Sequence, residues 1–259
     1  MKQTNNFASI ISTDELGILQ SLKLVTFDAT NTLLKFRVPP WEYYAMVACD
    51  YGFQVSNNCL KEPLKDSSKV MWEQYPNFGR KAMTWEDWWR KVVKLTFQGY
   101  LPANTNTDPL ANRLIDEFKT SKCWCIAEGG VDLVNLLKKK GITVGVISNF
   151  DPRLKDILQD VGLYKHIEFI ITSYDAGLSK PDPKIFHAAL GMFKGSLKPS
   201  EALHIGDDVR NDYEGARAAG WHAVLVNPNL NTKIPPATKH VFNSLNQLGL
   251  SIEQNNLKL

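Results

Sequence analysis

The sequence predicts an α/β fold in which helices cover both faces of a parallel sheet and a separate helical domain is inserted into the chain. Short β-branched runs alternate with segments of helical periodicity, the order expected of parallel strands joined by crossover helices. Tryptophan divides the chain, because six of its seven copies lie between residues 41 and 124. The length of 259 residues suits one large domain, or a medium domain that carries a smaller one.

The predicted strands are short and apolar, and they cover residues 23–27, 142–147, 169–171, 202–205 and 223–226. The helical patterns between them cover residues 131–140, 183–192 and 211–219. A short strand at 240–242 and an amphipathic segment at 245–250 follow. We expect residues 1–37 and 127–259 to form a Rossmann-like core, in which ligands bind beyond the carboxyl ends of the strands.

Residues 38–126 are expected to form a helical cap domain. One of its helices begins at Thr84, where Asp87 three positions later completes a pattern similar to a capping box. The apolar side chains of this helix recur at helical spacing and comprise Trp85, Trp88, Trp89, Val92 and Val93. Such a stripe is more typical of core or interdomain packing than of a ligand site. Residues 41–51 and 110–118 also have helical patterns.

The bulk composition gives no reason to expect a nucleic acid or a membrane as a partner. Thirty basic and 27 acidic residues leave a net charge of +3, too weak a field to attract either. Four irregularly spaced cysteines do not form a disulfide framework or a zinc motif, so reduced thiols are expected. No run approaches 18 apolar residues, and a cytoplasmic protein is predicted. The sequence makes no prediction of oligomeric state.

Small polar groups follow the first two predicted strands. Asp28, with Thr30 and Thr32 close behind it, comes directly after the strand 23–27. An acid at this point is either a helix cap or a functional group. Ser148 and Asn149 end the second strand, although these residue types also begin helices. Their interest comes from sharing one edge of the sheet with Asp28.

A lysine and an acidic cluster follow the next two strands. Lys180 precedes a proline-rich turn that can stiffen the backbone and aim the ammonium, although an ordinary surface lysine is the alternative. Asp207, Asp208 and Asp212 lie within six positions and would repel one another without a hard cation. Oxygen-only ligands suit magnesium. The alternative is that these acids are solvated or belong to the first turn of a helix.

The four strand ends together supply the groups that phosphoryl transfer needs. Asp28 would attack the phosphorus in line, while Lys180 and a Mg²⁺ cofactor neutralise phosphate oxygens. Ser148, or the backbone near it, would hold another phosphate oxygen. This combination predicts phosphoryl transfer, and the resemblance described next implies a hydrolase of a small-molecule phosphate ester.

The same four motifs, in this order, resemble those of the haloacid dehalogenase superfamily. The DxDxT motif corresponds to residues 28–32, the Ser or Thr motif to Ser148, the Lys motif to Lys180, and the GDxxxxD motif to residues 206–212. The resemblance runs from about residue 22 to about residue 250, with 38–126 in the place of the family's helical cap. Details at 148–150, 180–186 and 211–217 are similar to one subgroup of the superfamily.

The resemblance implies roles for individual residues. Asp28 would be the nucleophile, and Ser148 and Lys180 would hold the phosphate, with Asn149 beside them. The implied magnesium ligands are Asp28, the backbone oxygen of Thr30, Asp207 and, directly or through water, Asp208 or Asp212.

One position departs from the family's phosphatases, which carry a second Asp two residues after the nucleophile. Here that position is Thr30, and a hydroxyl cannot serve as the acid and base near neutral pH. We therefore expect slow turnover and a long-lived phosphorylated Asp28. Two alternatives stand beside this hypothesis: a degenerate relative that binds or regulates without catalysis, and a metal-independent dehalogenase, a reaction for which the acidic cluster would have no role.

Overall fold

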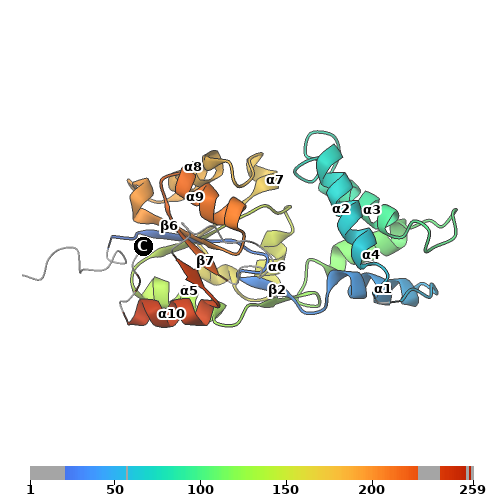
Figure 1. Cartoon of the computed structure of the whole chain (residues 1–259), viewed down its shortest axis with the longest axis horizontal. Helices are drawn as coiled ribbons and strands as arrows, with labels where there is room; N and C mark the ends of the chain where they lie inside the picture. The colour runs from blue at the N-terminus through green and yellow to red at the C-terminus, as the bar shows by residue number, and fades with distance from the viewer. Residues whose placement is uncertain (1–20, 57, 227–239, 255–256, 258–259) are drawn as a thin grey trace, which may run out of the picture.

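The computed structural model describes residues 21–56, 58–226, 240–254 and 257 of the chain. The first twenty residues of the predicted core therefore lie outside the described part. Figure 1 shows an elongated molecule in which the sheet and its helices occupy one end and the helices α1 to α4 occupy the other.

The sheet has six strands in the order β5-β4-β1-β6-β7-β8, and every neighbouring pair is parallel. The strands are β1 (Leu24–Phe27), β4 (Thr143–Ser148), β5 (Phe169–Thr172), β6 (Ala202–Gly206), β7 (His222–Val226) and β8 (Val241–Phe242). They agree with the predicted runs to within a residue or two at each end. The register pairs Phe27 with Val146 on one side and with Ile205 on the other, so the three central strands end level with one another.

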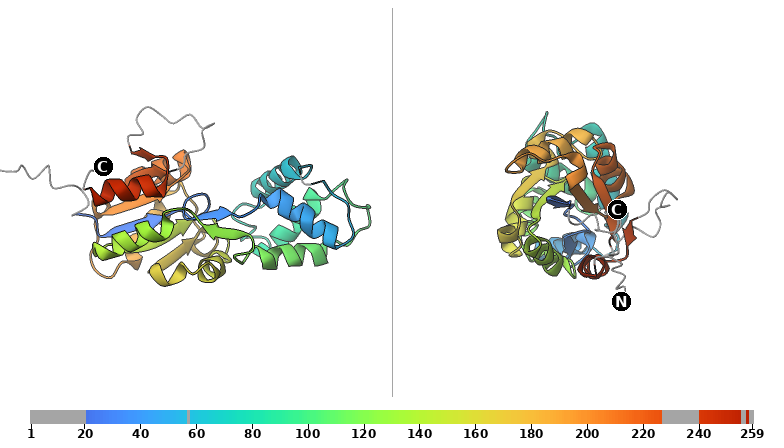
Figure 2. Two further views of the ribbon diagram at one scale, coloured as in Figure 1. Left: turned by 90° about the horizontal axis from the view of Figure 1, so that it is seen from below. Right: turned by 90° about the vertical axis from the view of Figure 1, so that its left-hand side faces the viewer.

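Helices cover both faces of this sheet, as predicted, because the strand side chains alternate between two apolar clusters. One face packs on α5 (Gly130–Lys139), α6 (Leu154–Asp160) and α10 (Leu245–Glu253). The opposite face packs on α8 (Pro183–Met192) and α9 (Gly215–Ala218). Figure 2 shows these layers in two further views. The shorter elements of the core are η2 (Tyr164–His166), α7 (Ser173–Ala176), η3 (Pro199–Glu201) and η4 (Val209–Glu214).

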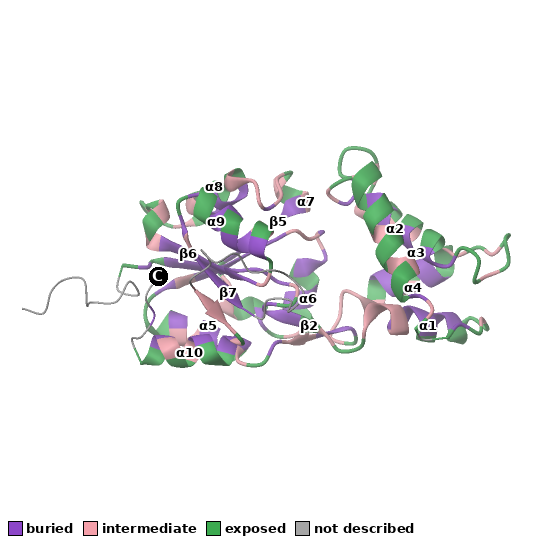
Figure 3. Cartoon of the chain, in the orientation of Figure 1, coloured by how far each residue is buried: buried purple, intermediate pink, exposed green. Residues whose placement is uncertain are grey.

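Four helices form a group of their own beyond the sheet: α1 (Pro40–Asp50), α2 (Lys61–Gln74), α3 (Trp85–Thr96) and α4 (Asp108–Glu117). At the start of α3, the hydroxyl of Thr84 accepts a hydrogen bond of 3.1 Å from the backbone N–H of Asp87, which confirms the predicted cap. The sequence did not predict α2, because its composition is polar and only Ser67 and Met71 of its residues are buried. Figure 3 shows the exposed outer faces of these helices.

Two short antiparallel strands carry the chain between this helical group and the sheet. They are β2 (Leu34–Phe36) and β3 (Trp124–Ile126), and Leu34 pairs with Ile126. None of the described helices combines the length and the apolar character needed to cross a membrane.

Candidate active site

The carboxyl ends of β1 and β4 and the turn after β5 bring three predicted residues into hydrogen-bond contact. The hydroxyl of Ser148 donates to Oδ1 of Asp28 over 3.0 Å, and Nζ of Lys180 donates to the same oxygen over 2.6 Å. All three side chains are buried. The backbone N–H of Asp28 donates to the carbonyl of Ile205 over 2.8 Å, which ties the start of this segment to β6. The predicted meeting of these residues at one sheet edge is therefore present.

Lys180 is held on several sides. Its ammonium also donates to Oδ1 of Asp212 over 2.5 Å and to the carbonyl of Ile147 over 2.9 Å. The side-chain amide of Asn149 pairs with the backbone of Lys180: Nδ2 donates to the Lys180 carbonyl over 2.9 Å, and Oδ1 accepts from the Lys180 N–H over 2.8 Å. Asn149 therefore contacts the turn that carries the ammonium, and through it acts on the position of Lys180.

Asp28, Asp207 and Asp212 form a group of carboxylates, in which one oxygen from each lies within 4.8 Å of the others. Carboxylate ligands of one Mg²⁺ lie up to about 4 Å apart, so small side-chain adjustments suffice for a shared ion. Thr32 belongs to the first motif, and its hydroxyl lies 3.5 Å from Oδ1 of Asp207. Gly206 permits this crowding, because a Cβ there would collide with the side chain of Asp212. The donor set fits magnesium.

Asp208 is not part of this group. Its exposed side chain caps η4 by accepting a 2.7 Å hydrogen bond from the backbone N–H of Asn211. Its own backbone N–H donates to Oδ2 of Asp212 over 2.9 Å. Of the two acids that the sequence left as alternatives, only Asp212 lies beside Asp28. The Asp208 side chain is exposed, as in the alternative that this acid is solvated, and its role as a cap of η4 was not predicted.

Thr30 lies in the tight turn that follows Asp28. The backbone N–H of Asn31 donates to the carbonyl of Leu34, and Asn31 adopts a left-handed conformation with φ of 61°, which asparagine tolerates better than most residues. Thr30 is half-buried and lines a cavity described below. The side chain at this position is a hydroxyl and not a carboxylate.

Burial and mutual repulsion shift the acids of the site. Burial, with a contribution from Asp212, raises the pKa of Asp28 to about 6 even though Lys180 opposes the change. Burial, Asp28 and Asp212 raise the pKa of Asp207 to about 7. Burial also acts to raise the pKa of Asp212, but the Lys180 ammonium and the hydrogen bond from His204 outweigh it and hold that pKa below its usual range. The site thus contains more negative charge than its lysine balances.

His204, to which the sequence assigned no role, lies beneath the carboxylates. Its Nε2 is 3.2 Å from Oδ1 of Asp212, and its Nδ1 is 2.8 Å from the hydroxyl of Thr26, its register partner on β1. Burial lowers the pKa of this imidazole. An ionised carboxylate only accepts hydrogen bonds, so the neutral ring donates from Nε2 and accepts at Nδ1 from Thr26. The sequence signal that could have identified His204 was a polar residue within the apolar run of β6.

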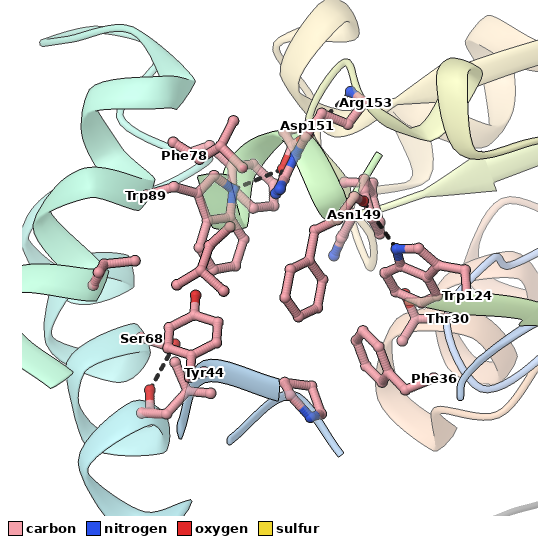
Figure 4. A pocket seen from close by; sticks show the side chains of 17 residues that line it. Thr30, Phe36, Tyr44, Ser68, Phe78, Trp89, Trp124, Asn149, Asp151 and Arg153 are labelled. Atoms are coloured by element: carbon pink, nitrogen blue, oxygen red, sulfur yellow. Dashed lines mark hydrogen bonds and ion pairs between the residues drawn. The ribbon is translucent and has the colours of Figure 1, made fainter. Parts of the chain in front are cut away.

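A cavity of about 290 Å³ opens between the strand ends and the helices α1 to α4 (Figure 4). An ion pair crosses its wall: the guanidinium of Arg153 lies 2.7 Å from Oδ2 of Asp151, and Trp89 of α3 donates to that oxygen over 2.8 Å. Trp88, its neighbour, packs in the core of the helical group, whereas Trp89 is partly buried and also lines the cavity. The contact from Trp89 to Asp151 spans 62 positions and has no local sequence signal.

The fold and these motifs together define a haloacid dehalogenase-like hydrolase. A family model described as haloacid dehalogenase-like hydrolase matches residues 22–220, and the chain belongs to that family. The rhythmically expressed gene 2 protein of Drosophila melanogaster is 40% identical over 220 residues, covering 80% of this chain and 84% of the relative. Haloacid dehalogenase-like hydrolase domain-containing protein 3 of Bos taurus is 35% identical over 240 residues, covering 88% and 95%. These relatives are the subgroup that the sequence details resembled.

Solved structures share the fold at low sequence identity. The HAD-hydrolase YfnB from Bacillus subtilis, bound to magnesium, superposes with a TM-score of 0.67 at 18% identity and covers 90% of this chain and 99% of its own. The L-2-haloacid dehalogenase from Xanthobacter autotrophicus gives 0.66 at 16% identity, with 90% and 98% covered. At these identities the likeness concerns the fold.

Proposed function

We propose that the protein is a magnesium-dependent phosphatase that hydrolyses a small phosphorylated metabolite through an aspartyl-phosphate on Asp28. The observation that supports this most directly is the buried contact of a carboxylate with one hydroxyl and one ammonium, beside two further acids. Phosphoryl transfer needs a nucleophile and fixed positive or hydrogen-bonding groups around the phosphate oxygens. Asp28, Ser148 and Lys180 supply these.

The charge of the site supports a divalent cation. Asp28, Asp207 and Asp212 against the single ammonium of Lys180 leave an excess of two negative charges when all are ionised. Asp28 and Asp207 have raised pKa values, which shows that their ionised forms are disfavoured without further compensation. A bound Mg²⁺ would neutralise this excess and polarise the phosphate.

The first half of the reaction follows from the hydrogen bonds of Asp28. Among the described residues, Ser148 and Lys180 both donate to Oδ1, so Oδ2 has free lone pairs for attack. Oδ2 forms a bond to phosphorus, the bond from phosphorus to the ester oxygen breaks, and the leaving oxygen takes up a proton from water. Ser148 and Lys180 would donate to the phosphate oxygens as charge builds on them.

The second half is where the chain departs from an efficient phosphatase. Water must attack the phosphorus, lose a proton, and break the bond to Oδ2 of Asp28. Thr30 occupies the position of the family's acid and base, and its hydroxyl cannot hold that proton near neutral pH. The consequence is slow turnover and accumulation of the aspartyl-phosphate.

Thr30 also supports a second candidate, a relative that binds a phosphorylated ligand and no longer turns it over. Retention of the nucleophile, the lysine and the carboxylate group weighs against that alternative, since each is costly to bury without a function or a partner. Dehalogenation needs no metal and would leave the group of Asp28, Asp207 and Asp212 without a purpose.

A panel of phosphate monoesters, assayed with and without Mg²⁺, tests the proposal. Phosphate release should need Mg²⁺ and disappear in the isosteric variant Asp28→Asn. Asp156→Asn, which changes an exposed acid on α6, is the matched control and should retain activity. Acid-quenched protein should carry phosphate on Asp28. Equal activity in Asp28→Asn, or no release and no phosphorylated protein from any ester, would contradict a phosphatase.

A further inference from the structure

The cavity between the strand ends and the helices α1 to α4 adjoins the reaction centre. Thr30, two residues after Asp28, and Asn149, which follows Ser148, form its end nearest the catalytic groups (Figure 4). A phosphate held by Ser148 and Lys180 would therefore direct its ester group toward this space. Its volume of about 290 Å³ compares with about 150 Å³ for a cavity that accepts benzene, so a group of one or two fused rings fits.

Seven of the 17 residues that line the cavity are aromatic, and their rings contact one another. Phe36 and Trp124 of the β2–β3 ribbon lie with ring centroids 4.0 Å apart, and Phe36 and Tyr44 each contact Phe118 edge-on at 6.1 and 5.9 Å. Phe150 approaches Trp124 from the strand end at 5.9 Å. Rings packed in this way have little freedom, so the apolar surface is formed before a ligand arrives.

The charged groups of the wall are already paired within the protein. Arg153 and Asp151 form an ion pair in which their side chains are 6% and 1% exposed, and the guanidinium also lies over the rings of Trp89 and Trp85 at 4.9 and 5.1 Å. Ser68 donates its hydroxyl to the carbonyl of Leu64 in its own helix over 2.8 Å. Among the described residues, the wall therefore has no unpaired cation for a second phosphate and few groups for a polyhydroxylated ligand.

Tyr44 supplies one polar exception. It lines the cavity and is 4% exposed, and among the described residues its hydroxyl has no hydrogen-bond partner. This hydroxyl oxygen is not fully enclosed by protein atoms, so it can pair with a single hydrogen-bonding group on a ligand that enters the cavity.

We propose that this cavity holds the leaving group and that the substrate is the phosphate monoester of an apolar, ring-bearing alcohol with at most one further polar group. Sugar phosphates, nucleotides and bisphosphates are disfavoured, because they would bury hydroxyls or charges against aromatic rings and paired ions. This substrate class rests on the phosphatase function proposed above.

Three esters of primary alcohols with similar intrinsic reactivity test the substrate class: 2-phenylethyl phosphate, glucose 6-phosphate and glycerol 3-phosphate. We expect kcat/KM for 2-phenylethyl phosphate to exceed both others by at least about tenfold. Ser68→Phe, which fills the cavity from α2, should reduce that ratio at least about tenfold. Lys69→Phe places the same ring on the exposed face of the helix and should leave the ratio unchanged.

A binding measurement separates the substrate class from turnover. The wild-type protein with Mg²⁺ should bind 2-phenylethylphosphonate, which cannot be hydrolysed at its carbon–phosphorus bond, at least about tenfold more tightly than 3-hydroxypropylphosphonate by calorimetry. Equal dissociation constants, or no binding of either compound, would overturn the substrate class. Asp28-dependent hydrolysis of all three esters at equal rates would overturn it too and leave the phosphatase intact. Selective phosphonate binding without any hydrolysis would support the class of ligand assigned to the cavity and contradict the phosphatase.

Discussion

The side-chain amide of Asn149 pairs with both backbone groups of Lys180, at 2.9 Å and 2.8 Å. An amide is well suited to this contact, because it offers a donor and an acceptor in one plane. The pairing links the end of β4 to the turn that carries the ammonium. The position of the charge that contacts Asp28 thus depends on Asn149, whose side-chain amide binds the backbone of Lys180.

Asn149→Ala should lower kcat/KM about 10- to 100-fold by releasing Lys180 from its position. It should also lower the free energy of unfolding by about 1–3 kcal/mol, since two hydrogen bonds are lost. Steady-state kinetics and urea unfolding measure the two effects. Asn112→Ala removes an exposed hydrogen bond to Arg90 and serves as the control. Unchanged kinetics in Asn149→Ala would show that the turn holds its position without the amide.

Lys180→Met should destabilise the Mg²⁺-free protein by about 3–5 kcal/mol, because Asp28 and Asp212 lose the buried cation that both contact. Added Mg²⁺ should restore part of that loss by supplying another positive charge. Urea unfolding with EDTA and with Mg²⁺ provides the comparison. A loss below about 1 kcal/mol in EDTA would mean that the two carboxylates become protonated without difficulty.

Mg²⁺ should raise the free energy of unfolding of the wild-type protein by about 2.7 kcal/mol when its concentration is 100 times the dissociation constant. Asp207→Asn should remove this gain, because Asp207 belongs to the group of three carboxylates. Asp208→Asn changes the adjacent acid, which caps η4, and should keep most of the gain. Calorimetric scans across a Mg²⁺ titration measure the gain in stability for Asp207→Asn and for Asp208→Asn. Equal loss in both variants would place Asp208 in the metal site.

Mg²⁺ affinity should fall as the pH is lowered through neutrality. Burial and the neighbouring acids raise the pKa of Asp207 to about 7, and a carboxylate must lose its proton to bind a cation. Protons therefore compete with the metal more strongly below about pH 7 than above it. Isothermal titration on either side of neutrality measures the change. Affinity that is constant down to about pH 5 would indicate an ionised Asp207 throughout.

Thr30→Asp should accelerate steady-state phosphate release by about 100- to 10,000-fold, the usual contribution of a positioned acid and base. Thr30→Asn, which has a similar shape and no titratable proton, should remain slow. Rapid-quench measurements should show that the aspartyl-phosphate accumulates in the wild type and in Thr30→Asn but not in Thr30→Asp. A Thr30→Asp variant no faster than the wild type would place the slow step elsewhere.

The order of the strands and the grouping of Asp28, Ser148 and Lys180 follow from sequence, because the ends of parallel strands share one edge. The choice between Asp208 and Asp212 does not. Both acids follow β6 at helix-compatible spacing. Only the geometry of η4 turns Asp208 toward the helix end and Asp212 toward Asp28.

Features that depend on distant contacts also lie beyond the sequence patterns. The ion pair of Asp151 and Arg153 is local, but its stacking on Trp85 and Trp89 joins two parts of the chain that are far apart in sequence. Helix α2 was not predicted because its composition is polar and few apolar residues mark its buried face. It is held by packing on α3, in which Met71 contacts the cluster around Trp88.

The pairing of Leu34 with Ile126 means that the polypeptide leaves the sheet and returns to it through adjacent strands. A segment whose two ends already meet behaves as an exchangeable cassette: its length and sequence can change while β1 and β4 keep their register. Divergence within such a cassette would alter which molecules are recognised and leave the reacting carboxylate where it is. Grafting the helices of a relative between Phe36 and Trp124 is therefore a practical route to chimeras with transferred selectivity.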